Sequence, residues 1–352
     1  MHDGNLRLFV TEKKERMCGR QPRARKLSEI VRVENLKRYF PIQKSVLEQR
    51  LSRKKSYVKA VDNLTFSIRK KEIFTLAGES GCGKTTTGRV LLRLTEPTSG
   101  RIYFKGEDIT RLKGERLRLL RQKMQVIFQD PYASLSPRMR VGDAIGHPLE
   151  IHGLAKHEEK TKAVLEVLAK VGLTPPEQFI NLYPVSLSGG QRQRVALARS
   201  IILKPEFMVA DEPVSMIDVS LRTTIIDLLL SFRNELVLTY LFVTHDLAIA
   251  KYISDRIAIM YLGKIVEIGT KQEIFSTPTH PYTQALLSAI PVPDPERKRK
   301  AMELKGEVPS AIKVPTGCRF HPGCPFAEKK CVIEEAELLP VTPTHSVACH
   351  RK

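Results

Sequence analysis

The chain of 352 residues can hold one large or two ordinary domains, and its 42% hydrophobic content excludes a chain too polar to build a core. An aromatic content of 6% and the absence of Trp argue against a nucleic-acid surface built on base stacking. The formal net charge of +20 leaves three interpretations open: a solvated tail, a basic edge on an anionic membrane surface, and a nucleic-acid contact.

The positive charge is concentrated near the N-terminus. Residues 1–56 contain 16 Lys or Arg against 6 Asp or Glu, so half of the net charge lies there. Residues 1–29 are polar and without hydrophobic periodicity, which predicts a flexible basic tail. No apolar run reaches the roughly 18 to 20 residues of a membrane-spanning helix, and the N-terminus lacks the apolar core of a secretion signal. We therefore expect the chain itself to be cytosolic.

Short apolar segments along the chain predict strands that alternate with helices. Strands are predicted at 32–40, 57–69, 72–78, 124–129, 207–211 and 239–246. Helical periodicity is found at 85–94, 160–172, 192–202 and 220–236. This alternation is typical of an α/β fold, in which helices cover the faces of a mostly parallel sheet. The basic insertion 41–56 indicates a hairpin loop or a short helix.

Two changes in the pattern suggest how the chain is divided. Residues 131–185 contain helices but no clear strand, which predicts a helical subdomain inserted into a domain that spans 30–290. Pro becomes frequent after residue 290, so we expect a boundary there and a separate C-terminal extension over 291–352.

A phosphate-binding loop follows the strand at 72–78. The segment GESGCGKTT fits G-x-x-x-x-G-K-[ST], and it stands between a predicted strand and a predicted helix, as that motif requires. Its backbone N–H groups would cradle the phosphates, Lys84 would reach the β and γ oxygens, and the Thr85 hydroxyl would bind Mg²⁺. Cys82 is either a thiol made acidic by the anion site or a small residue that the turn tolerates. The predicted ATP-binding residues of the loop are Gly78, Glu79, Ser80, Gly81, Cys82, Gly83, Lys84, Thr85 and Thr86.

Two adjacent carboxylates follow the strand at 207–211. Asp211 at the strand tip would hold the Mg²⁺ shell, and Glu212 would polarise an attacking water molecule. The alternative is a strand end with an acidic helix cap. The preceding phosphate loop favours the catalytic interpretation.

A second glycine stretch, LSGGQRQR at 187–194, opens a basic helix and forms another potential anion site. It resembles the signature sequence of ABC-type ATPases, and the order of the motifs over residues 30–290 matches that family. The resemblance implies a P-loop domain with an antiparallel β subdomain and an inserted helical subdomain. It also implies a head-to-tail dimer, in which the signature of one subunit covers the γ-phosphate held by the other. The residues that would act in trans are Ser188, Gly189, Gly190, Gln191 and Asp218.

The same resemblance implies roles for single positions. Gln129 is similar to the Q-loop residue, which contacts Mg²⁺ and the water, so the implied Mg²⁺ ligands are Thr85, Gln129 and Asp211. His245 is similar to the switch histidine that holds the γ-phosphate and Glu212 in register. Phe40 resembles the aromatic residue that stacks on adenine, with Tyr39 and Tyr57 as alternatives.

Two further segments, VIFQDPYASLSPRM at 126–139 and HPYTQALLSAIPVPDP at 280–295, resemble ATP-binding subunits of oligopeptide and dipeptide importers. The segments around the phosphate loop are most similar to the F-type subunit of that group. This implies a second, related ATPase, two membrane permease subunits, an extracytoplasmic substrate-binding protein, and a peripheral position on the cytoplasmic face of the membrane. The same machinery in this group also imports nickel or oligosaccharides. A soluble ABC ATPase acting on nucleic acid is the alternative, although we expect no nucleic acid.

Four of the six cysteines lie in the last 35 residues. Cys318, Cys324, Cys331 and Cys349 are separated by 5, 6 and 17 residues, and thiols in a reducing compartment are not expected to form disulfides. Four thiolates can bind a [4Fe–4S] cluster or a tetrahedral zinc ion. Similar tails in the resembled group carry an iron–sulfur cluster, while zinc and metal-free thiols are the alternatives. His321 and His350 adjoin the cysteines and are possible replacement ligands.

Overall fold

The computed structural model describes residues 29–42, 56–290 and 309–351. Residues 1–28 of the predicted basic tail, nearly all of the 41–56 insertion and the Pro-rich start of the C-terminal extension lie outside the described residues, while Glu29 begins the first strand.

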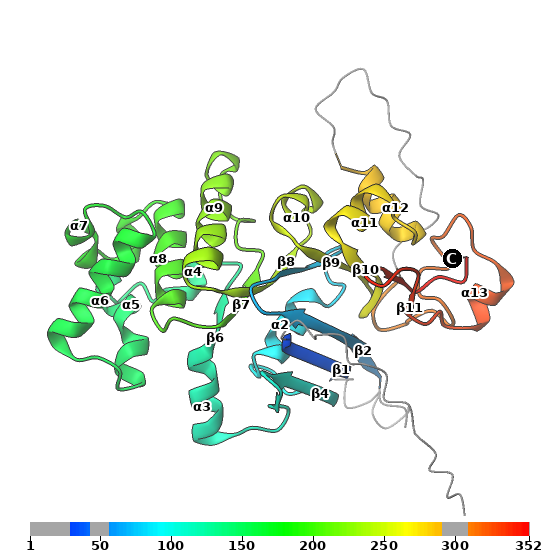
Figure 1. Cartoon of the computed structure of the whole chain (residues 1–352), viewed down its shortest axis with the longest axis horizontal. Coiled ribbons are helices and arrows are strands. Elements are labelled where there is room, and N and C mark those ends of the chain that lie inside the picture. The colour runs from blue at the N-terminus through cyan, green and yellow to red at the C-terminus, as the bar shows by residue number, and fades with distance from the viewer. Residues whose placement is uncertain (1–28, 43–55, 291–308, 352) are drawn as a thin grey trace, which may run out of the picture.

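A mixed sheet forms the centre of the described structure (Figure 1). Its parallel strands β6, β7, β8, β3 and β9 lie side by side, and β10, β12 and β11 continue the sheet in antiparallel pairs. In spatial order the strands are β6 (Met124–Ile127), β7 (Phe207–Asp211), β8 (Thr239–Thr244), β3 (Ile73–Ala77), β9 (Arg256–Tyr261), β10 (Lys264–Thr270), β12 (Ser346–Val347) and β11 (Leu339–Pro340).

The central strands are buried on both faces, because every residue of β3, β7 and β8 is buried. This explains why they are continuous apolar runs rather than alternating ones. Successive residues of β8 contribute to different cores: Tyr240 and Phe242 pack on the side of helices α8 (Gly189–Ile201) and α9 (Val219–Glu235), whereas Leu241 and Val243 pack on the opposite side.

An antiparallel sheet covers the second face. Its order is β2 (Tyr57–Arg69), β1 (Glu29–Pro41), β4 (Ser99–Phe104) and β5 (Glu107–Asp108). Its apolar residues share a core with helix α2 (Lys84–Leu91) and with one face of the central sheet. The sequence pattern predicted β1 and β2, but β4, β9 and β10 were not predicted. Helix α3 (Gly114–Lys123) follows this sheet and contributes no buried residue.

Helices fill the segment predicted to lack strands. They are α4 (Pro131–Ser134), α5 (Val141–Ile151), α6 (His157–Lys170), α7 (Pro176–Ile180) and a 3₁₀ turn at Pro184–Ser186. Together with α8 they form the green end of the molecule in Figure 1. This confirms the helical subdomain of the predicted fold.

The C-terminal region forms the opposite end of the molecule (Figure 1). It contains α11 (Lys271–Ser276), α12 (Pro281–Ser288) and α13 (Lys329–Ile333), whereas α10 (Leu247–Ile253) packs beside the central strands β3 and β8. A buried cluster joins Phe320 of the extension to Tyr261 of β9 and Tyr282 of α12. Arg319 forms a buried ion pair with Asp62 of β2, so the described part of the extension is packed against the antiparallel sheet.

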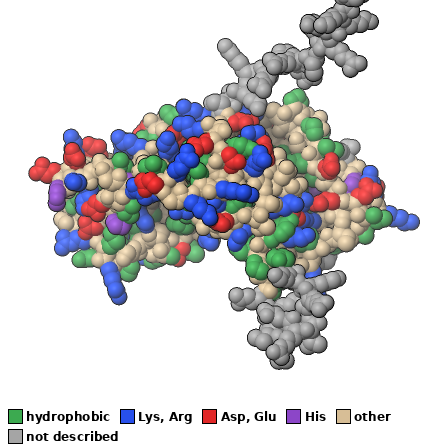
Figure 2. All heavy atoms as spheres, turned by 90° about the horizontal axis from the view of Figure 1, so that it is seen from below, with side chains coloured by type: hydrophobic (Ala, Val, Ile, Leu, Met, Phe, Trp, Pro, Cys, Tyr) green, Lys and Arg blue, Asp and Glu red, His purple; other side chains and the backbone are tan. Residues whose placement is uncertain are grey.

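The surface carries both signs of charge. On the face shown in Figure 2, Lys and Arg side chains are interspersed with Asp and Glu side chains. Among the described residues, no helix combines the length and the apolar character needed to cross a membrane.

Candidate functional site

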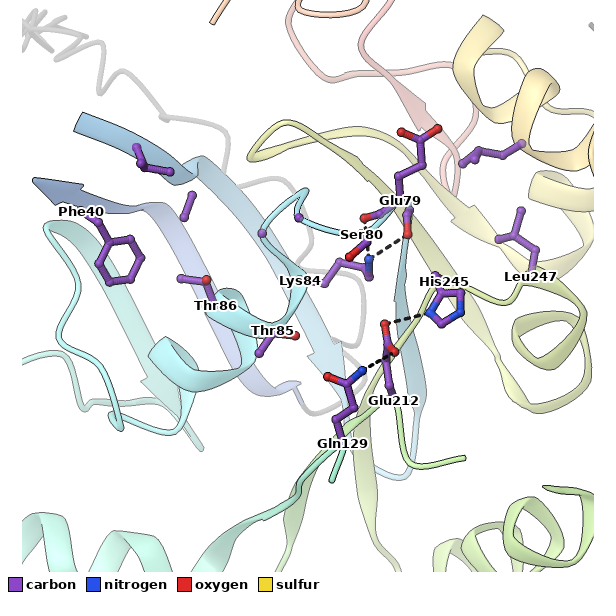
Figure 3. Close-up of a pocket in the computed structure, with 16 residues that line it drawn as sticks. Phe40, Glu79, Ser80, Lys84, Thr85, Thr86, Gln129, Glu212, His245 and Leu247 are labelled. Atoms are coloured by element: carbon purple, nitrogen blue, oxygen red, sulfur yellow. Dashed lines mark hydrogen bonds and ion pairs between the residues drawn. The ribbon is translucent and has the colours of Figure 1, made fainter. Parts of the chain in front are cut away.

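One pocket contains most of the predicted ATP-binding and catalytic residues (Figure 3). It lies where the carboxyl ends of the central parallel strands meet the antiparallel sheet, which is the usual place for a ligand in an open α/β sheet. Its lining includes Phe40, seven residues of the phosphate loop, and Gln129, Glu212 and His245. The loop residues in the lining are Gly78, Glu79, Ser80, Gly81, Gly83, Lys84 and Thr85, followed by Thr86 at the start of α2.

The phosphate loop requires glycine at two positions. Gly78 and Gly83 have φ angles of +148° and +109°. A Cβ atom would lie 2.2 Å from the Met260 carbonyl oxygen at position 78, and 1.9 Å from the Ala60 carbonyl oxygen at position 83. Both positions therefore permit a close approach of the loop to neighbouring backbone that no other residue allows.

Lys84 lies beneath the loop with its ammonium group already oriented. It is 4% exposed, and its Nζ donates hydrogen bonds to the carbonyl oxygens of Gly78 and Glu79, each at 2.8 Å. The next residue, Thr85, donates from its hydroxyl to Asp211 Oδ1 at 2.9 Å. A cation, loop amides and the N-terminus of α2 together form a site for an anion such as a polyphosphate.

Glu212 is held by two side chains from neighbouring segments. Gln129 Nε2 donates to Glu212 Oε2 at 3.0 Å, and His245 Nδ1 lies 2.9 Å from Glu212 Oε1 (Figure 3). Glu212 has a φ angle of 46°, which is unusual for a residue with a side chain. A carboxylate fixed in this way beside a phosphate loop is arranged to accept a proton from water.

Asp211 lies deeper than Glu212. It is 5% exposed, and burial raises the pKa of its carboxyl, with the charge of Glu212 adding to the effect and the Thr85 hydrogen bond opposing it. A divalent cation would offset both effects. Hydroxyl, amide and carboxylate oxygens are hard ligands that suit Mg²⁺, so Thr85, Gln129 and Asp211 fit the predicted metal.

Comparisons with known proteins agree with this geometry. Residues 61–215 match the family model described as ABC transporter, and residues 266–331 match the one described as Oligopeptide/dipeptide transporter, C-terminal region. The oligopeptide transport ATP-binding protein AppF of Bacillus subtilis (strain 168) is 46% identical over 324 residues, which cover 91% of this chain and 97% of AppF. The chain belongs to the family of ATP-binding proteins of oligopeptide/dipeptide ABC transporters. It is an ABC ATPase coupled to transport.

Other relatives and solved structures support the same family. A probable peptide ABC transporter ATP-binding protein, y4tS of Sinorhizobium fredii (strain NBRC 101917 / NGR234), is 42% identical over 321 residues, covering 91% of this chain and 89% of y4tS. The dimeric post-hydrolysis structure of the ATP-binding cassette MJ0796 bound to ADP and Pi aligns with a TM-score of 0.60 and 28% identity. It covers 68% of this chain and 98% of that chain.

Among the three aromatic candidates for adenine, the structure places Phe40 of this ABC ATPase in the pocket lining. The Arg38 guanidinium lies 4.4 Å from the centroid of the Phe40 ring. Tyr39 instead directs its hydroxyl to Asp62, and Tyr57 is 40% exposed at the start of β2.

The second glycine stretch is separate from the pocket lining. Ser188 caps α8 with a reciprocal capping box, in which its hydroxyl accepts from Gln191 N at 3.3 Å and its own N–H donates to Gln191 Oε1 at 2.9 Å. Of the described residues that line the pocket, none comes from 188–191 or is Asp218. These residues remain predicted to act in trans.

Some features of the pocket were not predicted from the sequence. Val58, Ala60, Leu247 and Leu286 complete its lining. Leu286 lies in α12, about two hundred residues after the phosphate loop, and the resemblance of the 280–295 segment did not place it at a nucleotide site. Cys82 is buried and absent from the pocket lining, and burial raises the pKa of its thiol despite the neighbouring Lys84, which favours its interpretation as a small residue that the turn tolerates.

The described cysteines of the C-terminal region are free thiols. Cys318 N donates to the Cys331 carbonyl oxygen at 2.8 Å. Burial raises the pKa of Cys318 to about 11, and the other three cysteines of the group add to it. Within the part of the chain that the structure describes, no three His, Cys, Asp or Glu side chains are arranged to hold a metal ion. The metal site at these four cysteines stays a prediction. His321 Nδ1 and His350 Nε2 lie at 2.9 and 3.0 Å from the carbonyl oxygens of Cys318 and Glu334.

Proposed function

We propose that this ABC ATPase is the ATP-hydrolysing motor of an importer for oligopeptides or dipeptides. The observation that carries the catalytic part is the position of Glu212, held by Gln129 and His245 beside the phosphate loop. The peptide cargo is supported by the printed names of AppF and y4tS and by the match over residues 266–331.

In the proposed reaction, the loop amides and Lys84 bind the phosphates of ATP. Bound Mg²⁺ would supply charge neutralisation of the β and γ oxygens, held by Thr85, Gln129 and Asp211. Water attacks the γ-phosphorus and passes its proton to the Glu212 carboxylate, while the bond to the β-bridging oxygen breaks and ADP leaves with that electron pair. His245 orients Glu212 from the opposite side of its carboxyl group.

A substitution of Glu212 tests this assignment. We expect Glu212→Gln to retain ATP binding and to lower turnover by about 10²-fold or more, because an amide cannot accept the proton. ATP hydrolysis and nucleotide binding are measured on the same preparation. Glu235→Gln, at the end of α9, is a matched control that removes a carboxylate away from the site. Unchanged turnover in Glu212→Gln would contradict the assigned role.

We propose the remaining roles from the same family relationship. Ser188, Gly189, Gly190, Gln191 and Asp218 would cover the γ-phosphate bound by a partner ATPase, and Phe40 would stack on adenine. The proposed organisation is a basic tail over 1–29, the ATPase domain over 30–290 with its helical subdomain over 131–185, and the extension over 291–352.

The proposed assembly contains a second related ATPase, two permease subunits and an extracytoplasmic substrate-binding protein, with this chain on the cytoplasmic face of the membrane. Membership of a transporter family favours this assembly over an ATPase acting on nucleic acid. Nickel and oligosaccharides are the alternative cargoes, which the resemblance to this group of importers leaves open.

We further propose that Cys318, Cys324, Cys331 and Cys349 hold a [4Fe–4S] cluster with a structural role, and zinc is the alternative ligand. The support is the donor set itself, which is four cysteines within one short segment of the chain. A cluster would stabilise a short segment that has little apolar core of its own.

Purification of the complex from membranes under anaerobic conditions tests the assembly and the cluster together. We expect two permeases, a second ATPase and about four iron atoms per site by mass spectrometry and metal analysis. Cys324→Ser should lose the iron while the partners are retained. Zinc in place of iron would contradict the cluster, and nucleic acid without permeases would contradict the assembly.

A further inference from the structure

A tyrosine of the C-terminal region contacts the phosphate loop from outside the pocket. Tyr282 of α12 is 0% exposed, and its hydroxyl accepts a hydrogen bond from the Glu79 backbone N–H at 3.2 Å. Burial, together with the nearby Glu79 carboxyl, raises the pKa of Tyr282, so this hydroxyl stays protonated at neutral pH. The contact joins segments about two hundred residues apart in the sequence.

This hydrogen bond acts on the peptide unit that positions Lys84. The Glu79 N–H and the Gly78 carbonyl belong to the same planar peptide unit. Lys84 Nζ donates to the Gly78 carbonyl oxygen at 2.8 Å, so the unit is held at one end by Tyr282 and at the other by Lys84. Without the hydrogen bond to Tyr282, the Gly78–Glu79 peptide unit would be free to rotate, and the position of the Lys84 ammonium group would change.

The loop backbone does not fix this peptide unit by itself. Gly78 has a φ angle of +148°, and glycine lacks the Cβ that restricts rotation in other residues. The orientation of the Gly78–Glu79 unit therefore depends on its hydrogen-bond partners.

The tyrosine ring is itself held in a buried aromatic cluster. Its centroid lies 4.6 Å from that of Tyr261 and 5.3 Å from that of Phe320, and Phe320 is 3% exposed. The Tyr282 N–H donates to His280 Nδ1 at 3.1 Å, which fixes the start of α12. Phe320 lies two residues after Cys318, so the ring contacts reach the cysteine-containing segment.

We propose that Tyr282 is a positioning residue for nucleotide binding. Its hydroxyl, fixed by the rings of Tyr261 and Phe320, orients the Gly78–Glu79 peptide so that Lys84 is held ready for the phosphates before nucleotide arrives. The proposal rests on ATP binding by this family and is independent of the cargo. The physical basis of the proposal is preorganisation. Ordering a flexible loop when nucleotide binds costs free energy, and this cost makes binding weaker.

Tyr282→Phe tests the proposal, because it removes the hydroxyl and keeps the ring. ADP, which is not hydrolysed, is titrated with Mg²⁺ into the full-length chain by calorimetry. We expect the Kd for ADP to rise about three- to tenfold, the range that corresponds to one net hydrogen bond. Turnover at saturating ATP should stay within about twofold, because Glu212, Gln129 and His245 are untouched.

Tyr240→Phe is the matched control. Tyr240 is also fully buried, and within the described residues its hydroxyl has no hydrogen-bond partner. A purely structural effect would lower the unfolding temperature and the fraction of active protein while leaving the Kd for ADP unchanged. The proposal is overturned if Tyr282→Phe binds ADP with the same Kd as the parent protein, or if Tyr240→Phe raises the Kd for ADP by the same factor as Tyr282→Phe. Phe320→Leu should also raise the Kd for ADP. An unchanged Kd in this variant would remove Phe320 from the proposal.

Discussion

At the residue scale, the two adjacent carboxylates at the end of β7 have different environments. Asp211 is buried and accepts from Thr85, whereas Glu212 turns away with a φ angle of 46° and meets Gln129 and His245. Holding a residue other than glycine in this left-handed backbone conformation costs of order 1–3 kcal/mol, and interactions in the surrounding structure must offset this cost. The Glu212 N–H donates to the Val243 carbonyl oxygen at 2.9 Å and contributes to that offset. The unusual turn directs the two neighbouring carboxylates to different partners, as their proposed roles towards a metal and a water molecule require.

Phe40 provides the residue-scale prediction. We expect Phe40→Ala to raise the Kd for ATP about tenfold, because it removes an aromatic face at the edge of the pocket. Tyr57→Ala, at an exposed position on the neighbouring strand, should leave the Kd unchanged. Fluorescence titration with a labelled ATP analogue measures both. Equal effects of the two substitutions, or an effect of Tyr57→Ala alone, would remove Phe40 from the adenine site.

At the element scale, the C-terminal segment is joined to the ATPase fold by hydrogen bonds at helix α11. Thr270 and Glu273 form a reciprocal capping box at the start of this helix. Glu273 Oε1 also accepts from the hydroxyls of Thr342 and Thr344 at 2.9 and 2.7 Å. The side chain that caps α11 therefore also anchors the turn between β11 and β12.

The pKa of Glu273 gives a prediction with a defined sign. Burial raises it, but hydrogen bonds from Thr344, Thr270 and Thr342 outweigh burial and lower it from 4.5 to about 2. Because the pKa of this carboxyl is lower in the folded protein than in the unfolded chain, the ionised carboxylate stabilises the fold fully above about pH 4.5. This contribution is lost as the pH falls towards about 2. We expect Glu273→Gln to lower the free energy of unfolding at pH 7 by about 1–3 kcal/mol.

Urea unfolding at pH 7 and at several values below pH 4.5 measures this difference. The gap between the parent and Glu273→Gln should narrow as the pH falls. Glu158→Gln, at an exposed position in the first turn of α6, should change little. A gap that is constant with pH would show that the loss comes from packing and not from the carboxylate.

At the scale of the whole molecule, the two glycine-rich segments of the ABC ATPase are placed on different parts of the surface. The phosphate loop lines the pocket, whereas the capped start of α8 lies outside its lining. A single chain therefore leaves the signature residues away from its own nucleotide site. Such an arrangement suits a head-to-tail dimer, and the aligned MJ0796 structure is dimeric.

Dimer formation is the prediction at this scale. With ATP and the second ATPase of the proposed assembly present, we expect the Glu212→Gln chain of 39.8 kDa to form a stable two-subunit complex by light scattering, because trapped ATP holds the two ATPases together. Adding Ser188→Arg should abolish the dimer while leaving ATP binding to the monomer intact. Thr161→Arg, at an exposed position on α6, is the control and should still dimerise. A dimer that persists with Ser188→Arg would contradict the trans role.

The sequence by itself determined the catalytic motifs and the parallel core. The phosphate loop, Asp211 and Glu212 are recognisable because each stands within a few residues of a strand that is buried on both faces. Such local patterns follow from backbone geometry and need no knowledge of distant contacts. The short strand β4 and the hairpin of β9 and β10 lack so clear a local signal.

Only the tertiary structure decided which distant residues complete the site. Leu286 lines the pocket, Tyr282 contacts the phosphate loop, and Arg319 pairs with Asp62, although each lies far along the chain from its partner. These contacts arise because β9 and β10 carry the C-terminal region back against the first strands. None of these residues belongs to a motif for phosphate binding, so only folding brings them close to the nucleotide pocket.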